Sequence, residues 1–189
     1  LASPGFHNAL NATVAVAVAV DLGLSIEKIK KGISQFAGVA RRFQYRGEIN
    51  GVSFIDDYAH LPTEVESALE AAKAGKWNRI VAVFQPHRFT RTNDLASTFS
   101  DCFQDADEIV ITGIYSAGEK AIPGVTGKLV ADAVTSKAIG KNVRYCEHRE
   151  DLIVFLRELL VEGDLCLTLG AGDLTNIVDQ LMGALEDGQ

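Results

Sequence analysis

Residues 48–65 read EINGVSFIDDYAHLPTEV, and this stretch decides the fold. Its Asn50-Gly51 pair stands between two runs of residues with strand preference, which strongly indicates a β-hairpin with a two-residue turn. The second run, Val52–Ile55, is apolar and is followed by two carboxylates, a phenol and an imidazole. Pro62 then opens an expected helix. The stretch therefore predicts a hairpin whose second strand carries polar chemistry at its carboxyl end.

Beyond the hairpin, short β-prone runs alternate with helical patterns. The expected strands are 79–84, 108–114, 143–146 and 165–169, and the expected helices are 62–74, 94–103, 128–138, 151–160 and a last one after Asp173. The helix expected at 94–103 would bury one face, made of Leu95, Phe99, Cys102 and Phe103. This alternation predicts an α/β fold: a Rossmann-like open, mostly parallel sheet with helices on both faces and an initial antiparallel hairpin.

The first 38 residues have a different residue pattern, which predicts two helices. The first, over residues 7–22, is rich in alanine and valine and ends at Gly23. The second, over residues 26–36, is capped by Ser25 and places Ile26, Ile29 and Ile33 on one face. The residue pattern changes after Gly38, so we expect a first unit of residues 1–38 and a second unit of residues 39–189.

Composition excludes several classes of function. The chain has 189 residues, of which 47% are hydrophobic and 23% charged, and this is the balance of a globular protein. Its net charge of -7 argues against a nucleic-acid or anionic membrane surface as the main partner. The longest apolar run, Ala12–Val20, is too short to span a bilayer. The three cysteines show no metal-ligand spacing, which is typical of a cytosolic protein.

Polar segments follow four of the expected strands. In open α/β sheets, ligands bind outside the carboxyl ends of the strands. The segments are Asp56–His60, Gln85–Arg91, Tyr115–Glu119 and Gly170–Asp173. We expect Asp57, Tyr58, His60, Arg88 and Arg91 to converge at one sheet edge, with residues 170–172 on the rim and the Asn50-Gly51 turn at the opposite edge. The alternative is a set of polar turns that only solvate themselves.

Arg88 and Arg91 are the most informative pair. Their spacing of three residues would aim both guanidinium groups the same way, and such planar donor forks suit a carboxylate or a phosphate. The alternative is two surface arginines paired with nearby acidic residues. Asp56 and Asp57 could hold magnesium, a ribose hydroxyl or a substrate ammonium group, but one of them is expected to be structural.

Two glycine-rich segments do not complete a nucleotide-binding motif. Residues 124–129 read GVTGKL, so Leu129 occupies the hydroxyl position of a P-loop and Ile122 the position of its first glycine. Gly170-Ala171-Gly172 lacks the third glycine of a dinucleotide fingerprint, because Thr175 stands there. The chain therefore has no complete nucleotide-binding motif of its own.

Taken together, the motifs resemble the Mur ligase family, and within it the alanine-adding members. The resemblance runs nearly end to end, and its segments are PGFHNALNA (4–12), GVARRF (38–43), FIDDYAHLPTEV (54–65), FQPHRFTRT (84–92), YSAGEKAIPG (115–124) and LGAGD (169–173). The most specific part is FQPHRFTRT together with DDYAH. In this family a central domain carries the P-loop and a carboxyl-terminal Rossmann-like domain closes over it.

The resemblance implies ATP-dependent amide-bond formation in bacterial peptidoglycan synthesis. ATP would phosphorylate the lactyl carboxylate of UDP-N-acetylmuramate, and the amine of L-alanine would then attack the acyl phosphate. Residues 1–38 would be the tail of the central ATPase domain and 39–189 the carboxyl-terminal domain. The chain begins at Leu1, so we expect it to be a fragment. It would act together with the remaining domains of one cytoplasmic polypeptide. The central domain would supply most of the ligands of magnesium.

The same resemblance assigns roles to individual residues. Asn8 and Asn11 would help to hold ATP, with His7 nearby. Arg42 would contact the ATP phosphates and Asp57 the nucleotide ribose or the surroundings of magnesium, and these two are the expected catalytic residues. The amino-acid and muramyl carboxylate site would be lined by Tyr58, His60, Arg88 and Arg91, with the backbone of Gly170 and Ala171 beside it.

One residue departs from the family pattern, and three alternatives remain. Leu61 stands where the family often has a second histidine, so any contact of that histidine with the amino acid is lost or moved in this chain. A ligase that recycles murein tripeptide is one alternative, but Arg88 and Arg91 favour the alanine-adding enzyme. Folylpolyglutamate synthetase shares the architecture but not DDYAH. A nucleotide-binding module without catalysis is the alternative from another class.

Overall fold

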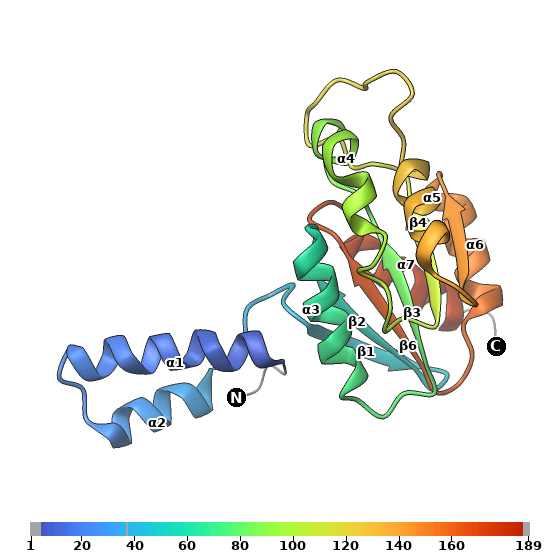
Figure 1. Ribbon diagram of the computed structural model, residues 1–189. Helices are drawn as coiled ribbons and strands as arrows, with labels where there is room; N and C mark the ends of the chain where they lie inside the picture. Colours follow the sequence, from blue (N-terminus) through green and yellow to red (C-terminus); the bar gives the residue numbers. More distant parts are fainter. Residues whose placement is uncertain (1–4, 37, 187–189) are drawn as a thin grey trace.

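The structure is a computed structural model and describes residues 5–36 and 38–186. A six-stranded sheet forms its centre, with the strand order β1-β2-β6-β3-β4-β5 (Figure 1). The strands are β1 (Gln44–Ile49), β2 (Val52–Asp57), β3 (Arg79–Phe84), β4 (Glu108–Thr112), β5 (Asn142–Cys146) and β6 (Asp164–Leu169). β1 and β2 are antiparallel and every other neighbouring pair is parallel, which confirms the α/β fold expected from the sequence.

The hairpin at the start of the sheet has the predicted turn. Asn50 and Gly51 connect β1 to β2 with positive φ angles of 53° and 73°. Two successive left-handed residues form the mirror-image turn that matches the twist of a hairpin, and asparagine followed by glycine adopts it at little cost. The turn lies at the end of the sheet opposite to Asp57, because β2 runs between them.

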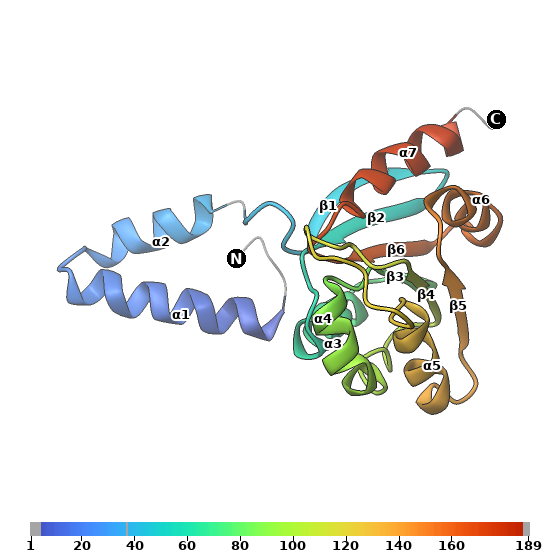
Figure 2. The same ribbon diagram turned by 90° about the horizontal axis from the view of Figure 1, so that it is seen from above.

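Helices cover both faces of the sheet (Figure 2). On one face lie α3 (Pro62–Lys73), α4 (Phe89–Leu95), the short 3-10 helix η1 (Ala96–Phe99) and α5 (Lys128–Lys137); on the other lie α6 (Arg149–Leu159) and α7 (Thr175–Glu186). Alternate side chains of each strand point to opposite faces, so the sheet separates two apolar layers. Phe84 and Leu167 belong to the layer under α3 and α5, whereas Val83 and Cys166 belong to the layer under α6 and α7.

The helix expected at residues 94–103 is wrong in its extent. The helical segment begins at Phe89, tightens to 3-10 geometry at Ala96 and gives way to turns after Phe99. Thr98 donates its hydroxyl hydrogen bond to the backbone oxygen of Leu95, and such side-chain bonds compete with regular helix. The predicted burial pattern is confirmed for Phe99, Cys102 and Phe103, which are buried, whereas Leu95 is only partly buried.

Two further helices, α1 (Phe6–Asp21) and α2 (Ile26–Gln35), form a hairpin that projects from the sheet (Figure 1). Ser25 caps α2 as expected, accepting a hydrogen bond from the backbone N–H of Lys28 at 3.5 Å. The predicted apolar face of α2 is only partly buried, since Ile29 is buried but Ile26 is 51% exposed. The chain passes from this hairpin to the sheet at Gly38–Phe43, and the division into units 1–38 and 39–189 stays a prediction.

None of the helices in residues 5–36 and 38–186 has both the length and the apolar character needed to cross a membrane.

Replacing Phe84 by alanine is expected to destabilise the sheet unit by about 3–5 kcal/mol, because a buried aromatic side chain leaves a cavity when truncated. Phe84 is fully buried, with its ring centroid 5.0 Å from that of Phe99 and 5.7 Å from that of Phe103. Denaturant unfolding followed by the fluorescence of Trp77, the single tryptophan, which packs against the same layer, measures the change. The control Ile139→Ala, at a 94% exposed side chain, should stay within about 0.5 kcal/mol.

Candidate active site

The candidate site lies where β2, β6 and β3 end. These three parallel strands are neighbours, with β6 between the other two, so their carboxyl ends meet at one edge of the sheet. The backbone continues the pairing past the strand ends: the N–H of Gly170 donates to the oxygen of Asp57, and the N–H of Gln85 donates to the oxygen of Leu169. The segments 56–60, 85–91 and 170–173 therefore leave the sheet side by side.

Asp56 is a structural carboxylate. It is 1% exposed, and its two oxygens accept hydrogen bonds from the hydroxyls of Thr168 and Thr175, each at 2.8 Å. The Nε of Arg41 lies 3.2 Å from the same carboxylate, and this pairing compensates the buried charge. Arg41 also donates from Nη2 to the oxygen of Gly170 at 2.6 Å. Its guanidinium group therefore connects the entry segment (residues 38–43), β2 and the glycine loop (residues 170–172).

Asp57 points away from this network and reaches the opposite side of β2. Its carboxylate accepts the backbone N–H groups of Phe43 at 2.7 Å and of Ala59 at 2.8 Å. Burial raises the pKa of Asp57 above its ordinary value, while these two N–H groups and the positive charge of Arg42 act in the opposite direction. These two backbone donors thus fix the carboxylate in place beside Arg42.

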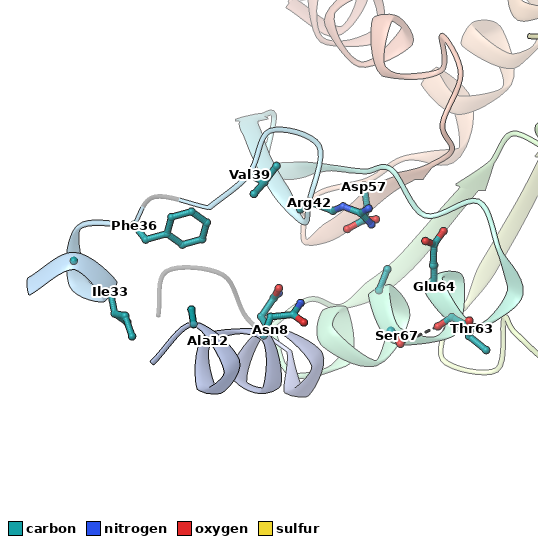
Figure 3. A pocket seen from close by; sticks show the side chains of 14 residues that line it. Asn8, Ala12, Ile33, Phe36, Val39, Arg42, Asp57, Thr63, Glu64 and Ser67 are labelled. Atoms are coloured by element: carbon teal, nitrogen blue, oxygen red, sulfur yellow. Dashed lines mark hydrogen bonds between the residues drawn. The ribbon is translucent and has the colours of Figure 1, made fainter. Parts of the chain in front are cut away.

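A cavity of about 720 Å³ separates the helical hairpin from the sheet (Figure 3). Its lining residues are Asn8, Asn11, Ala12 and Ala15 of α1, Gly32 and Ile33 of α2, then Phe36, Val39, Arg42, Asp57, Thr63, Glu64, Ser67 and Ala68. Figure 3 shows Arg42 and Asp57 close together on one wall, with Asn8 across the space. The structure thus brings Asn8, Asn11, Arg42 and Asp57 around one cavity. The backbone of His7 lies in α1, but its side chain is outside what the structure describes.

Four aromatic rings form a row along the same edge. The ring centroids of Tyr58 and His60 are 5.4 Å apart, those of His60 and His87 are 5.6 Å apart, and those of His87 and Tyr115 are 5.7 Å apart. At the cavity end of the row, the guanidinium of Arg42 lies 5.5 Å from the ring of Tyr58. The row therefore leads from the cavity toward the segment that follows β4.

The two arginines of the FQPHRFTRT segment differ in their surroundings. Arg91 reaches the row, with its Nη1 3.1 Å from Nδ1 of His87. Arg88 has a positive φ of 70° and lies 3.6 Å from Glu119, which sits in the long loop between β4 and α5 (Figure 1). Glu119 also accepts two hydrogen bonds from Thr90, from its N–H and its hydroxyl. Arg91 thus joins the expected cluster directly, whereas Arg88 is engaged at its margin.

Burial lowers the pKa of His87, and the neighbouring charge of Arg91 lowers it further. This shift favours the neutral form of the imidazole.

The glycine loop 170–172 closes the edge beside Tyr115. A Cβ atom at Gly172 would clash with Oε1 of Gln85 and with the ring of Tyr115, so only glycine fits there. Ala171, between the two glycines, is half-buried. The predicted rim is therefore in place next to the row of rings.

Three residues of this edge were not among the predicted site residues. His87 and Tyr115 belong to the row, and Glu64 lies 3.2 Å from Nδ1 of His60. His87 and Tyr115 lie in two of the segments that the strand-end rule selected, but neither residue was assigned a role. Glu64 gave no such indication, because an acid in the first turn of a helix is commonly a capping residue.

The described residues fit a nucleotide better than a metal ion. The cavity has the volume of a typical small-molecule site and combines an apolar wall with amide, guanidinium and carboxylate groups. Within residues 5–36 and 38–186, no group of three His, Cys, Asp or Glu side chains could hold a metal ion. The lining thus offers polar partners to a small organic ligand with anionic groups, whereas residues 5–36 and 38–186 contain no cluster of ligands for magnesium.

Comparison with known proteins identifies relatives. The family model described as Mur ligase, glutamate ligase domain, matches residues 41–172. The UDP-N-acetylmuramate–L-alanine ligase of Pelotomaculum thermopropionicum is 44% identical over 189 residues, which is 100% of this chain and 41% of the relative. That of Carboxydothermus hydrogenoformans is 47% identical over 180 residues, covering 95% of this chain and 38% of the relative.

A solved structure is similar as well. The UDP-N-acetylmuramate-alanine ligase of Thermotoga maritima superimposes with a TM-score of 0.79 and 30% identity, covering 98% of this chain and 39% of that one. The chain thus spans about two fifths of the length of its curated relatives.

Proposed function

The chain belongs to the Mur ligase family, and from that premise we propose that it forms part of an ATP-dependent ligase joining L-alanine to UDP-N-acetylmuramate. It would supply the carboxyl-terminal domain, residues 39–189, and the tail of the central ATPase domain, residues 1–38. The rest of the polypeptide would supply the P-loop and most of the ligands of magnesium. The enzyme would act in the bacterial cytoplasm, in peptidoglycan synthesis.

The cavity between the two units would hold ATP. Arg42 would lie along the phosphates, where positive charge stabilises the charge that develops during phosphoryl transfer. Asp57, fixed by two backbone N–H groups, would accept a hydroxyl of the ribose. Asn8 and Asn11 would bind from the α1 side, with His7 near them, and Phe36 would offer an apolar surface to the base.

The row of rings would hold the two substrates that react. The lactyl carboxylate of UDP-N-acetylmuramate would take the γ-phosphoryl group of ATP and become an acyl phosphate, with ADP as the leaving group. Arg91, with Arg88 beside it, would bind a carboxylate, while Tyr58 and His60 would lie along the amino acid. The backbone of Gly170 and Ala171 would close the site, where the absence of long side chains lets a substrate approach the sheet edge.

One observation carries this proposal: a cavity of about 720 Å³ is lined from one side by Asn8 and Asn11 and from the other by Arg42 and Asp57. A site divided between two units suits a reaction that must exclude water, because closing the units shields the acyl phosphate from hydrolysis.

The test uses the full-length protein, purified and supplied with ATP, magnesium and UDP-N-acetylmuramate. Formation of ADP should depend on L-alanine, and mass spectrometry should detect the L-alanyl product. Glycine and L-serine in place of L-alanine would define the selectivity for the amino acid. Activity only with murein tripeptide would favour the recycling ligase instead, and nucleotide binding without any ADP formation would favour the module without catalysis.

A further inference from the structure

The hydrogen bonds of His60 fix which ring nitrogen carries its proton. Nδ1 of His60 lies 3.0 Å from the backbone oxygen of Tyr58 and 3.2 Å from Oε2 of Glu64. A carbonyl oxygen and a carboxylate can only accept, so Nδ1 must donate. In the neutral imidazole, Nε2 then keeps its lone pair. His60 therefore offers a proton acceptor on the side of the ring away from Glu64.

His87 has the opposite arrangement. Its Nδ1 lies 3.1 Å from Nη1 of Arg91, and a guanidinium group has no acceptor, so Nδ1 must accept. The proton of the neutral ring is then on Nε2. The pKa of His87 is lowered, chiefly by burial, which agrees with a neutral ring. The rings of His60 and His87 are neighbours, 5.6 Å apart between centroids, and the contacts of their Nδ1 atoms give them opposite tautomers.

We propose that His60 is the general base that takes a proton from the ammonium group of the incoming amino acid, and that Glu64 is the residue that positions it. The inference rests on the proposed ligase function and assigns a step within it.

The reaction requires such a base because an ammonium group has no lone pair with which to attack. Nε2 of His60 would take one proton and leave a neutral amine. The amine nitrogen would form the C–N bond as the bond between the carbonyl carbon and the phosphate oxygen breaks, and phosphate would leave with that electron pair and with the second amine proton. The imidazolium would then release its proton to water. A general base placed in this way typically contributes about 100-fold to 10,000-fold in rate.

Glu64 is held where it can serve this role. Oε2 accepts the backbone N–H groups of His60 at 2.9 Å and of Leu61 at 3.1 Å, so its position is fixed from the first turn of α3. Its negative charge beside Nδ1 stabilises the imidazolium that forms when Nε2 takes a proton. The contact with Leu61 uses only the backbone, so it does not depend on the side chain at that position.

The other charged and titratable groups near His60 do not supply a competing base. Tyr58 lies on the same segment, and its ring faces Arg41 and Arg42, whose guanidinium groups are 5.0 Å and 5.5 Å from its centroid. From the β3–α4 segment, His87 faces His60 with Arg91 behind it. Arg88 lies farther along that segment and is paired with Glu119. Among these neighbours, Glu64 is the carboxylate in contact with the His60 ring.

The experiment compares two nucleophiles in the full-length protein. L-alanine is an ammonium ion near pH 7 and needs a base, whereas the nitrogen of hydroxylamine is already neutral there and does not. In His60→Gln, transfer to L-alanine should fall by about 100-fold or more. Formation of the hydroxamate from the acyl phosphate, with ATP and UDP-N-acetylmuramate present, should stay close to that of the unchanged protein. The ratio of the two rates does not depend on how much of the variant is folded.

Glu64→Gln should lower the same ratio by a smaller factor, because glutamine keeps an acceptor near Nδ1 but not the charge. A purely structural role of Glu64 in starting α3 would reduce both rates together and leave the ratio unchanged. Two matched controls should keep the normal ratio: Glu70→Gln, an exposed position on α3, and His148→Gln, an exposed histidine before α6.

Three results would overturn the inference. An unchanged ratio in His60→Gln would mean that His60 takes no proton from the amine. A loss of both rates in equal measure would make His60 a binding or structural residue. If the unchanged protein forms neither amide nor hydroxamate with ATP, the proposed ligase function itself is wrong, and the role of His60 falls with it.

Discussion

In the full-length protein, Arg42→Ala and Asp57→Ala are each expected to lower turnover by about 100-fold to 1000-fold, the usual cost of removing a group aimed at developing charge. Arg42 lines the cavity, and Asp57 lies beside it with both oxygens held by backbone N–H groups. Steady-state ADP release measures the change, and circular dichroism checks that the fold is retained.

Arg157→Ala is the matched control, because Arg157 is an exposed arginine on α6, on the other face of the sheet. Its turnover should stay close to that of the unchanged protein. Near-normal turnover in Arg42→Ala or Asp57→Ala would contradict a catalytic role for that residue. Arg42 would then be a structural residue of the entry segment, or Asp57 a structural residue at the end of β2.

The second large effect is expected from the 189-residue chain on its own. It should neither hydrolyse ATP nor join L-alanine to UDP-N-acetylmuramate, because its sequence contains no complete P-loop. Phosphate release and mass spectrometry of the products, with the full-length protein in parallel, are the measurements. ATP-dependent ligation by the purified chain would contradict both this expectation and the proposed division of labour between domains.

The sheet could be predicted from the sequence because its determinants are local. The Asn50-Gly51 turn specifies its own geometry, and the alternation of short apolar runs with helical patterns specifies parallel strands. The order of the strands is not local. β6, the last strand in the chain, lies between β2 and β3, and only packing of the complete domain places it there.

The region after β3 was predicted poorly because contacts between residues distant in sequence determine its structure. Glu119 lies 29 residues from Thr90 and accepts its N–H in the first turn of α4, so a distant loop supports the start of this helix. Residues close in sequence give no indication of such a partner. The apolar pattern still identified Phe99 and Phe103 as buried, since burial depends on side-chain chemistry more than on the exact backbone geometry.

The candidate site, too, could be predicted only where its determinants are local in sequence. The rule about strand ends pointed to Asp57, Tyr58, His60 and Arg91, which the structure places along one edge. It could not distinguish Asp56 from Asp57, because the two are adjacent and only tertiary contacts give one of them an arginine partner. It also could not pair Arg88 with Glu119, which depends on the path of the loop between β4 and α5.

The cavity between the helical hairpin and the sheet has a thermodynamic consequence. Its walls belong to the α1–α2 hairpin and to residues that follow the connecting segment Gly38–Phe43, so a ligand that touches both walls favours the arrangement in which they face each other. Thermodynamic linkage makes this effect reciprocal. The free energy by which a bound nucleotide favours the facing arrangement of the two walls equals the free energy that nucleotide binding gains when the walls already face each other. A substitution in the connecting segment that changes only the populations of open and closed arrangements would therefore alter the apparent Kd without removing a single contact to the ligand.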